Sequence, residues 1–498
     1  MQKLFSIIFL SLLFSQLCTE SVTASSVNRL GIRTGANGKQ EFYDVVTQNA
    51  VLLRGNNYIR AKDYGTPEKP VWVGNTNFSP GQYNRTQNIQ ALNQMKQYRY
   101  NAVRIFVNRY DVGNKTGTGL SAEYMNNMVD FIKLANERQL YVFITFSGIP
   151  SYGKYQPSVT NPNIEAPYHI WLLIPEYVQA KKKYVKDVVN TMKEKGVPLE
   201  TLIYTIENEP YFEMDKKPFS LTQGNIRVAN GQTYNMANTA NDKNRLMEDS
   251  LVYYMNTVRQ GIKEADPQAL IGITLFSPLT GRTQNANWQI KTGKTFTQSS
   301  ADFISINMYP GTGNIDEEMA AFEMGTSKKP LVLSEFGAYP HIYGTIDRGA
   351  EAMKDMQVKT CQQYGFKGWF AYEWDTSDYD SFFRIFHVVE GNGAINIGLA
   401  PLYRADPCKT ENTAQVTIAP TATRSPTPTK KTIPTTTKTP ILGDLNNDKK
   451  IDAADYNKLI TSFNKTGASG WIDADIIKNG KVDIFDYNIV VGNFGKTQ

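Results

Sequence analysis

Two glutamates at the ends of apolar runs are the residues of this sequence best suited to chemistry. The segment 206–210 reads Ile-Glu-Asn-Glu-Pro, and the segment 333–337 reads Leu-Ser-Glu-Phe-Gly. Two carboxyl groups can share one reaction: one protonates a leaving oxygen, and the other attacks carbon or activates water. Carboxyl groups that meet also resist double ionisation, so one keeps its proton. The pattern predicts a two-carboxylate site made of Glu209 and Glu335.

Eight apolar, strand-like runs alternate with helical segments and would have to position these glutamates. Helical periodicity is clear where Met125, Met128, Val129, Ile132 and Ala135 share one face, and again between residues 178 and 192. The alternation predicts an α/β fold, a (β/α)₈ TIM barrel, in which the carboxyl ends of the strands meet at one mouth. The eight runs are 51–58, 101–107, 140–146, 202–208, 269–276, 303–309, 330–335 and 368–374.

Composition divides the 498 residues into four parts. Residues 1–24 read as a signal peptide, because Lys3 precedes an apolar run and Val22-Thr23-Ala24 offers a cleavage site. A membrane anchor is the alternative, but the run is short for one. Residues 25–408 form the predicted barrel, 409–440 a Thr/Pro-rich linker, and 441–498 a second domain. We therefore expect a secreted, extracellular protein with no membrane segment after signal removal.

The net charge of +6 is scattered along the chain and does not form runs, which argues against a nucleic-acid partner. After cleavage the chain keeps two cysteines, Cys361 and Cys408, and these could pair in an oxidising exterior. The sequence alone leaves the pairing open. Sugar stacking and core packing are equally good interpretations of Trp72, Trp171 and Trp288.

The two glutamate motifs together resemble glycoside hydrolase clan A, and most closely its family 5 of cellulases and mannanases. The resemblance covers most of residues 50 to 380 and implies that Glu209 is the acid/base and Glu335 the nucleophile of a retaining mechanism. It also implies that Arg104 and Tyr309 support the nucleophile and that Trp374 lies under the cleaved sugar. Asn208 would donate its amide to the sugar 2-hydroxyl.

Two features depart from that resemblance or complicate it. Family 5 members usually carry histidines at the ends of strands three and six, whereas this chain has Ser147 and Asn307 there. The substrate and the exact hydrolase family therefore stay open. Glu207, two residues before Glu209, could form an ion pair inside the barrel or be mistaken for the acid.

The resemblance implies a retaining endo-β-glycosidase that acts on β-1,4-glucan or β-mannan, of the cellulase or mannan endo-1,4-β-mannosidase type. One alternative is an exo-acting or transglycosylating enzyme, in which the loop 211–242 blocks one end of the cleft. Another is an inactive carbohydrate-binding barrel. No cofactor is expected for catalysis.

The C-terminal region carries two loops with the oxygen-ligand spacing that binds Ca²⁺. In the first, Asp444, Asn446, Asp448, the Lys450 carbonyl, Asp452 and Asp455 hold positions 1, 3, 5, 7, 9 and 12, and a helix is predicted over 456–463. The second is less complete, because Ile477 stands where an oxygen ligand is expected. Its candidate ligands are Asp475, Asn479, Lys481 through its carbonyl, Asp483 and Asp486.

This duplication of loop and helix resembles a dockerin, a small all-α domain with two EF-hand-type calcium loops. The resemblance implies structural Ca²⁺ and a cohesin-bearing scaffold protein as partner, which would place the enzyme in a cellulosome-like complex. A calcium clip with only a structural role is the alternative.

Overall fold

The structure is a computed structural model of the chain, and it divides into two compact units, residues 1–410 and 411–498. The described residues are 27–408 and 442–498, apart from short gaps. The predicted signal peptide, including residues 1–24, and the predicted linker 409–440 lie outside them. The gaps are 37, 64, 65, 67, 68, 70, 118, 160, 166, 167, 238–240, 280–284, 310–313, 377–383, 464, 479, 483–485, 488, 491, 492, 494, 495 and 498.

Eight parallel strands close into a barrel in the order β12-β14-β15-β16-β3-β6-β7-β8. Each of the eight predicted runs supplies one strand, so the (β/α)₈ barrel prediction is confirmed. The pattern was readable because strands buried on both faces are almost continuously apolar. The strands are β3 (Leu53–Asn57), β6 (Ala102–Val107), β7 (Tyr141–Phe146), β8 (Leu202–Asn208), β12 (Leu270–Phe276), β14 (Phe303–Asn307), β15 (Leu331–Phe336) and β16 (Gly368–Ala371).

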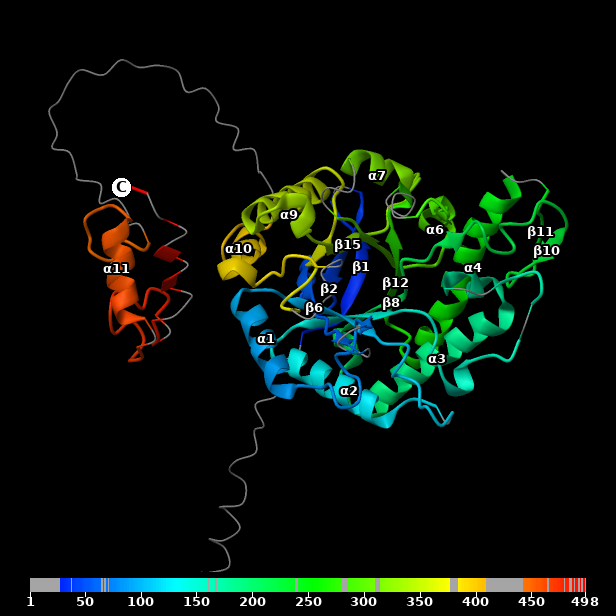
Figure 1. Ribbon diagram of the computed structural model, residues 1–498, viewed down its shortest axis with the longest axis horizontal. Helices are drawn as coiled ribbons and strands as arrows, with labels where there is room; N and C mark the ends of the chain where they lie inside the picture. The colour runs from blue at the N-terminus through cyan, green and yellow to red at the C-terminus, as the bar shows by residue number, and fades with distance from the viewer. Residues whose placement is uncertain are drawn as a thin grey trace, which may run out of the picture. The chain divides into compact units, whose positions relative to one another are not determined.

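Helices pack around the barrel, as Figure 1 shows. Both predicted amphipathic helices form: α2 (Ala122–Glu137) buries one stripe and is capped by the Ser121 hydroxyl, and α3 (Pro175–Glu194) begins with a proline. The others are α1 (Arg85–Gln97), α4 (Asn241–Ala265), α6 (Gly293–Gln298), α7 (Ile315–Ala321), α8 (Pro340–Tyr343), α9 (Ile346–Gln362) and α10 (Glu390–Leu399), with 3₁₀ turns η1 (Gly153–Tyr155), η2 (Tyr168–Leu173) and η3 (Leu199–Thr201).

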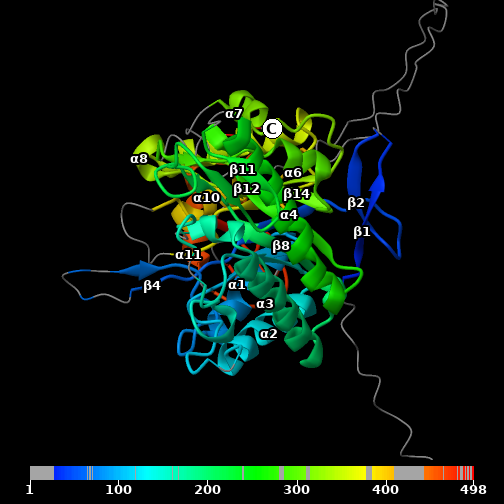
Figure 2. The same cartoon turned by 90° about the vertical axis from the view of Figure 1, so that its right-hand side faces the viewer.

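An amino-terminal hairpin packs against the residues that begin the barrel strands. Strand β1 (Leu30–Thr34) pairs with β2 (Gln40–Asp44), and Leu30 and Phe42 join a cluster with Leu53, Ala102 and Tyr141, which stand at the start of their strands. Figure 2 shows the hairpin at the edge of the molecule. Because apolar packing fills the amino ends of the strands, their carboxyl ends are left to form a site.

The long insertion 211–242 contains a small hairpin, β10 (Asn225–Arg227) with β11 (Thr233–Asn235). The Tyr234 hydroxyl donates to Asp249 of α4 at 3.0 Å, and Figure 1 shows the hairpin beside α4, away from the barrel strands. The hairpin of this loop therefore packs against α4 on the outside of the barrel. Two further ribbons are β4 (Lys62–Asp63) with β5 (Trp72–Val73), and β9 (Phe212–Glu213) with β13 (Trp288–Gln289).

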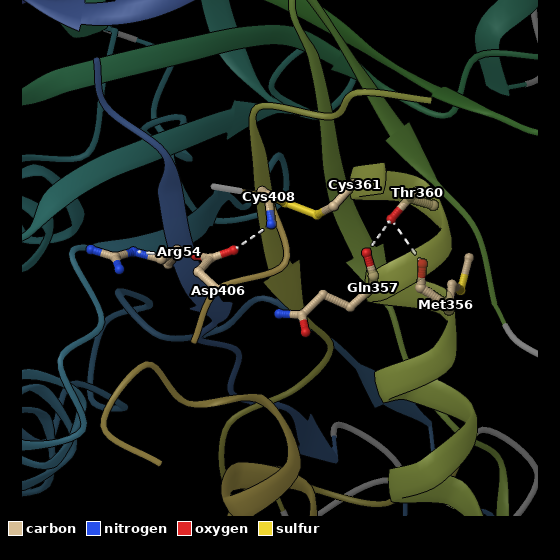
Figure 3. Close-up of a disulfide and its surroundings, with 7 residues drawn as sticks. All are labelled: Arg54, Met356, Gln357, Thr360, Cys361, Asp406 and Cys408. Carbon is tan, nitrogen blue, oxygen red and sulfur yellow. Dashed lines mark hydrogen bonds and ion pairs between the residues drawn. A yellow bond between two sulfur atoms is a disulfide. The ribbon is translucent and has the colours of Figure 1, made fainter. Parts of the chain in front are cut away.

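A disulfide joins Cys361, in the last turn of α9, to Cys408 at the end of the described barrel unit (Figure 3). Beside it, Asp406 accepts a hydrogen bond from the Cys408 amide at 2.9 Å and lies 3.7 Å from the Arg54 guanidinium of β3. The disulfide therefore ties the end of the unit to a barrel helix. The pairing that the sequence left open is present.

The C-terminal unit has its own small core. Helix α11 (Ala453–Ser462) begins three residues earlier than predicted. Asp452 is its N-cap, and a capping box with Asp455 closes its first turn. Asn479 and Asp483, together with the apolar Ile484 and Phe485, lie outside the described residues, so the second loop is described only in part. The core consists of Leu445, Ile451, Leu459, Ala474, Val482 and Val490.

None of the helices formed by the described residues has the length and apolar character that crossing a bilayer requires.

Candidate active site

Glu209 and Glu335 reach the same mouth from two non-adjacent strands. Glu209 follows the last residue of β8, and Glu335 is the penultimate residue of β15 and only 4% exposed. Glu209 has a left-handed backbone, with φ of 51°, and its amide donates to the Thr274 carbonyl of β12 at 3.0 Å. A non-glycine residue in this region carries backbone strain, so the surrounding structure must hold this turn.

The Glu335 carboxylate is held by one cation and one hydroxyl. Arg104 donates to Oε1 at 2.5 Å, and the Tyr309 hydroxyl donates to Oε2 at 2.6 Å. Burial and the charge of Glu335 raise the pKa of Tyr309 well above its usual value, so its phenol stays protonated and keeps donating.

The Arg104 guanidinium is fully buried, and side chains from three neighbouring elements fix its orientation. Its Nη1 donates to Asn57 at 2.7 Å, its Nε to Thr145 at 2.9 Å, and its Nη2 to the Asn208 side-chain oxygen at 2.9 Å. Arg104 thus links Glu335 to the residue before Glu209. Since the carbonyl end of Asn208 accepts from Arg104, its amide group is the end available as a donor.

Glu209 lies in a different electrostatic environment from Glu335. Burial first, and then the charge of Glu335, raise the pKa of Glu209 to about 8, against the opposing effects of Asn307 and Arg104. The Asn307 amide donates to Glu209 Oε1 at 2.6 Å. A pKa of about 8 keeps Glu209 mostly protonated at neutral pH, which is the state that the acid of a two-carboxylate mechanism needs.

Asn307 belongs to the site, although from the sequence it was noted only because family 5 members usually have a histidine at this position. It ends β14 and pairs in register with Glu335 of β15. The Ser334 hydroxyl donates to its side-chain oxygen at 2.6 Å, which turns the amide nitrogen towards Glu209. Its place at the end of a barrel strand was the one available signal.

The structure contradicts the prediction that Trp374 lies under the cleaved sugar. Trp374 has 0% exposure and packs against Tyr98 and Tyr100, with ring centroids 6.2 and 6.1 Å apart. A ring with no exposed face has no surface for a sugar. Tyr372, two residues earlier, directly follows β16 and is half-buried, and its ring centroid lies 6.1 Å from that of Tyr309. It is therefore the aromatic residue at the carboxyl end of β16 that can face a ligand.

Glu207 forms an ion pair and does not contribute to the mouth. It is fully buried, 3.2 Å from the Lys181 ammonium of α3, and accepts from Tyr254 of α4 at 2.6 Å. Burial acts to raise the pKa of Glu207. The charges of Lys181 and His169, together with hydrogen bonds from Tyr254 and the Gly148 amide, outweigh burial, so the pKa lies below its usual value. Of the two readings of Glu207, the ion pair is confirmed.

Two aromatic rings lie beside Glu209. Tyr211 stacks on Trp288 with centroids 4.2 Å apart, and the paired strands β9 and β13 hold the two residues together. Both rings are half-buried and line a recess with Glu209. Trp171 is 5% exposed and packs against Tyr254, which makes it a core residue.

In the C-terminal unit, Asp444, Asp448 and Asp455 bring carboxylate oxygens within 4.8 Å of one another. Asn446 lies in the same loop and donates to Asp448 at 3.0 Å. Asp452 acts as the N-cap of α11, accepting from the Ala454 amide at 2.8 Å. Carboxylate oxygens are among the ligands that Ca²⁺ takes in proteins.

The predicted second loop is described only in part. Asp475 and Asp486 are buried, and Asp475 accepts from the Gly470 and Gly480 amides at 2.7 and 3.0 Å. Its other candidate ligands are Lys481, which is described, and Asn479 and Asp483, which are outside the described residues.

Solved structures that resemble the chain include an exo-β-1,4-mannosidase from Opitutaceae bacterium strain TAV5 (14% identity, TM-score 0.47, covering 74% of this chain and 57% of that one). They also include an endo-1,4-β-mannanase from Rhizomucor miehei (12% identity, TM-score 0.48, covering 75% of this chain and 98% of that one). A third is a β-mannanase from Mytilus edulis (14% identity, TM-score 0.43, covering 76% of this chain and 98% of that one). The chain thus spans little more than half the length of the Opitutaceae enzyme, and no curated protein matches it.

The family model described as cellulase, glycosyl hydrolase family 5, matches residues 64–377, which is more than half of the 498 residues. This span contains both glutamate motifs and the strands that carry them. The chain therefore belongs to glycosyl hydrolase family 5 and is a glycoside hydrolase.

Proposed function

We propose that the chain is a secreted, retaining endo-β-glycosidase of β-1,4-glucan or β-mannan, with Glu209 as acid/base and Glu335 as nucleophile. The observation that carries this is the contrast between the two carboxyl groups. Arg104 and Tyr309 donate to the two oxygens of Glu335, while burial and Glu335 itself favour the protonated form of Glu209. A double displacement needs these two states before the first step.

The mechanism follows from these states. Glu335 attacks the anomeric carbon while Glu209 gives its proton to the departing glycosidic oxygen, which leaves a glycosyl ester on Glu335. Glu209, now ionised, takes a proton from the water that attacks the same carbon, and the bond to Glu335 breaks. The Asn208 amide is positioned by Arg104 to donate to the sugar 2-hydroxyl during both steps.

A direct test is to trap the intermediate. A 2-deoxy-2-fluoro glycoside with an activated leaving group should label the protein, and peptide mass spectrometry should place the label on Glu335. Glu335→Gln should take no label and lose hydrolysis by about 10⁴-fold or more. Label on another residue, or full activity in Glu335→Gln, would refute the assignment.

Internal cleavage is favoured over the exo-acting alternative by the position of the 211–242 insertion. Its hairpin, β10 with β11, packs on α4, so this part of the loop does not cap the cleft. Product analysis on cellulose, mannan, xylan and mixed-linkage glucan would identify the sugar. A fall in polymer viscosity ahead of reducing-end release indicates endo action, and release of a single short product throughout would favour exo action.

Secretion is supported by the disulfide, because such bonds persist in oxidising compartments. Sequencing the amino terminus of the protein from culture medium should find the mature chain starting near Ser25. Retention in the cell with an intact Met1 would contradict the proposal.

For the C-terminal unit we propose a calcium-dependent, dockerin-like module that binds a cohesin. Three carboxylates meet in the first loop, and the helix that follows has Asp452, a candidate ligand of that loop, as its N-cap. Calorimetry with Ca²⁺, and then with a panel of cohesins, tests both parts. Calcium binding without any cohesin binding would favour the structural clip.

A further inference from the structure

A buried charged cluster lies directly behind the turn that carries Glu209. Glu207 and Lys181 both have fully buried side chains and are 3.2 Å apart. Glu207 also accepts from the Gly148 amide at 2.7 Å and from the Tyr254 hydroxyl at 2.6 Å, and Lys181 donates to the Gly148 carbonyl. The cluster thus joins β8 to the residues after β7 and to helices α3 and α4.

Stability alone is a weak reason for this cluster. A buried ion pair is costly to desolvate, and replacing one by apolar groups of similar size is often neutral or stabilising. Lys181 is surrounded by apolar rings, with its ammonium about 6 Å from Phe146, Trp171 and Tyr184. What the pair contributes beyond a set of apolar contacts is direction, since hydrogen bonds fix where the backbone lies.

The cluster contacts both ends of the Asn208–Pro210 turn. On one side, the backbone N–H of Asn208 donates to Glu207 Oε1 at 3.4 Å. On the other, His169 lies 3.9 Å from Glu207 and packs edge-on against Tyr211, which follows Pro210. Between these anchors Glu209 holds its left-handed backbone, so small shifts of either anchor move its carboxyl group.

We propose that Glu207, paired with Lys181, is a positioning residue that sets the acid/base Glu209 against the leaving group. The inference rests on the proposed function of Glu209 and goes beyond it. Glu335 is held by Arg104 and Tyr309, and Arg104 has further partners in Thr145 and Asn57, so loss of the cluster should disturb the nucleophile less than Glu209. The defect should therefore concern proton delivery.

Proton delivery can be isolated by the choice of leaving group. Cleavage of a dinitrophenyl glycoside needs little help from an acid, whereas cleavage of an unsubstituted phenyl glycoside of the same sugar needs protonation. The value of kcat/KM reports the first displacement in both. In full-length Glu207→Gln we expect kcat/KM to fall about 100-fold on the phenyl substrate, as for a catalytic group misplaced by about 1 Å, and less than about threefold on the dinitrophenyl substrate.

Further variants guard against a general loss of folding. Tyr254→Phe removes one hydrogen bond to Glu207 and should show the same selectivity with a smaller loss. The double variant Glu207→Leu/Lys181→Met removes both charges while keeping apolar bulk, and should remain folded with the phenyl substrate most affected. Lys186→Met is the matched control, since Lys186 is on α3 but pairs with Glu264 at the surface.

Equal losses on the two substrates, or no loss in variants whose melting temperatures match the wild type, would overturn the inference. A wild-type chain that cleaves neither substrate, nor any polymer, would instead overturn the proposed function. If the wild type hydrolyses both glycosides and Glu207→Gln keeps the same ratio of kcat/KM between them, the positioning role alone is refuted.

Discussion

Carboxyl groups converge in two regions of this molecule, but the protein balances their charge in only one. At the barrel mouth, Arg104 and Tyr309 donate to Glu335, and Asn307 donates to Glu209. In the first loop of the C-terminal unit, the carboxylates of Asp444, Asp448 and Asp455 accept hydrogen bonds from backbone N–H groups, and Asp448 also accepts one from the Asn446 side chain. Among the described residues, no Lys or Arg forms an ion pair with these three.

The difference fits the two roles that we propose, hydrolysis at the barrel mouth and ion binding at the loop. A carboxylate with its own cation is held ready to act on a substrate. Three carboxylates within 4.8 Å and without a cation repel one another until a divalent ion neutralises them. The barrel mouth should therefore be complete without metal, whereas the loop should depend on it.

The largest expected effect comes from removing the cation of the mouth. Arg104→Met should lower kcat by about 10² to 10³-fold, because an orienting and charge-stabilising donor to Glu335 is lost. Steady-state kinetics on a polymer and an aryl glycoside measure this. Circular dichroism and the melting temperature show whether the barrel is intact. Unchanged kcat in a folded variant would mean that the mouth does not depend on its own cation.

Calcium removal should act on the other region only. Chelation should unfold the C-terminal unit, since Ca²⁺ at about 1,000 times its dissociation constant stabilises a binding-competent fold by about 4 kcal/mol. Calorimetric scanning of the full chain with and without chelator should shift one transition and leave the barrel transition and hydrolysis unchanged. Loss of hydrolysis on chelation would break the comparison.

Reduction of the disulfide should give the reciprocal result. The bond closes a separation of 47 residues, and Cys361→Ser/Cys408→Ser should lower the barrel's free energy of unfolding by about 2 to 4 kcal/mol. The same scan reports it. The calcium affinity of the C-terminal unit should not change, and a change there would show that the two regions are coupled.

The smallest expected effect concerns pH. Glu209 must be protonated for the first displacement, so kcat/KM should fall as pH rises through its pKa of about 8. The Asn307 amide favours the ionised form of Glu209. Its removal in Asn307→Ala should therefore move the alkaline limb to higher pH by about half to one unit. Asn190→Ala, on the outside of α3, is a matched control, and a downward shift in Asn307→Ala would contradict the assignment.

The barrel was predictable because its strands are buried on both faces and stand out as eight apolar runs. Glu209 and Glu335 were found by their places at the ends of such runs, and Arg104 and Tyr309 contact Glu335 as the resemblance implied. Trp374 was misplaced, because a tryptophan near a strand end fits a core layer as well as a sugar platform. Which way a side chain faces after a strand ends depends on the turn, and the sequence does not specify that turn.

The sequence by itself determined the strand order along the chain, the two acidic motifs and the spacing of the calcium loop, because these follow from local periodicity and residue type. Only the tertiary structure decided that Glu207 belongs to a buried ion pair and that Asn307 holds Glu209. It also paired Cys361 with Cys408. The reason is physical: burial and charge at a position depend on residues from distant strands and helices, which meet only when the barrel closes.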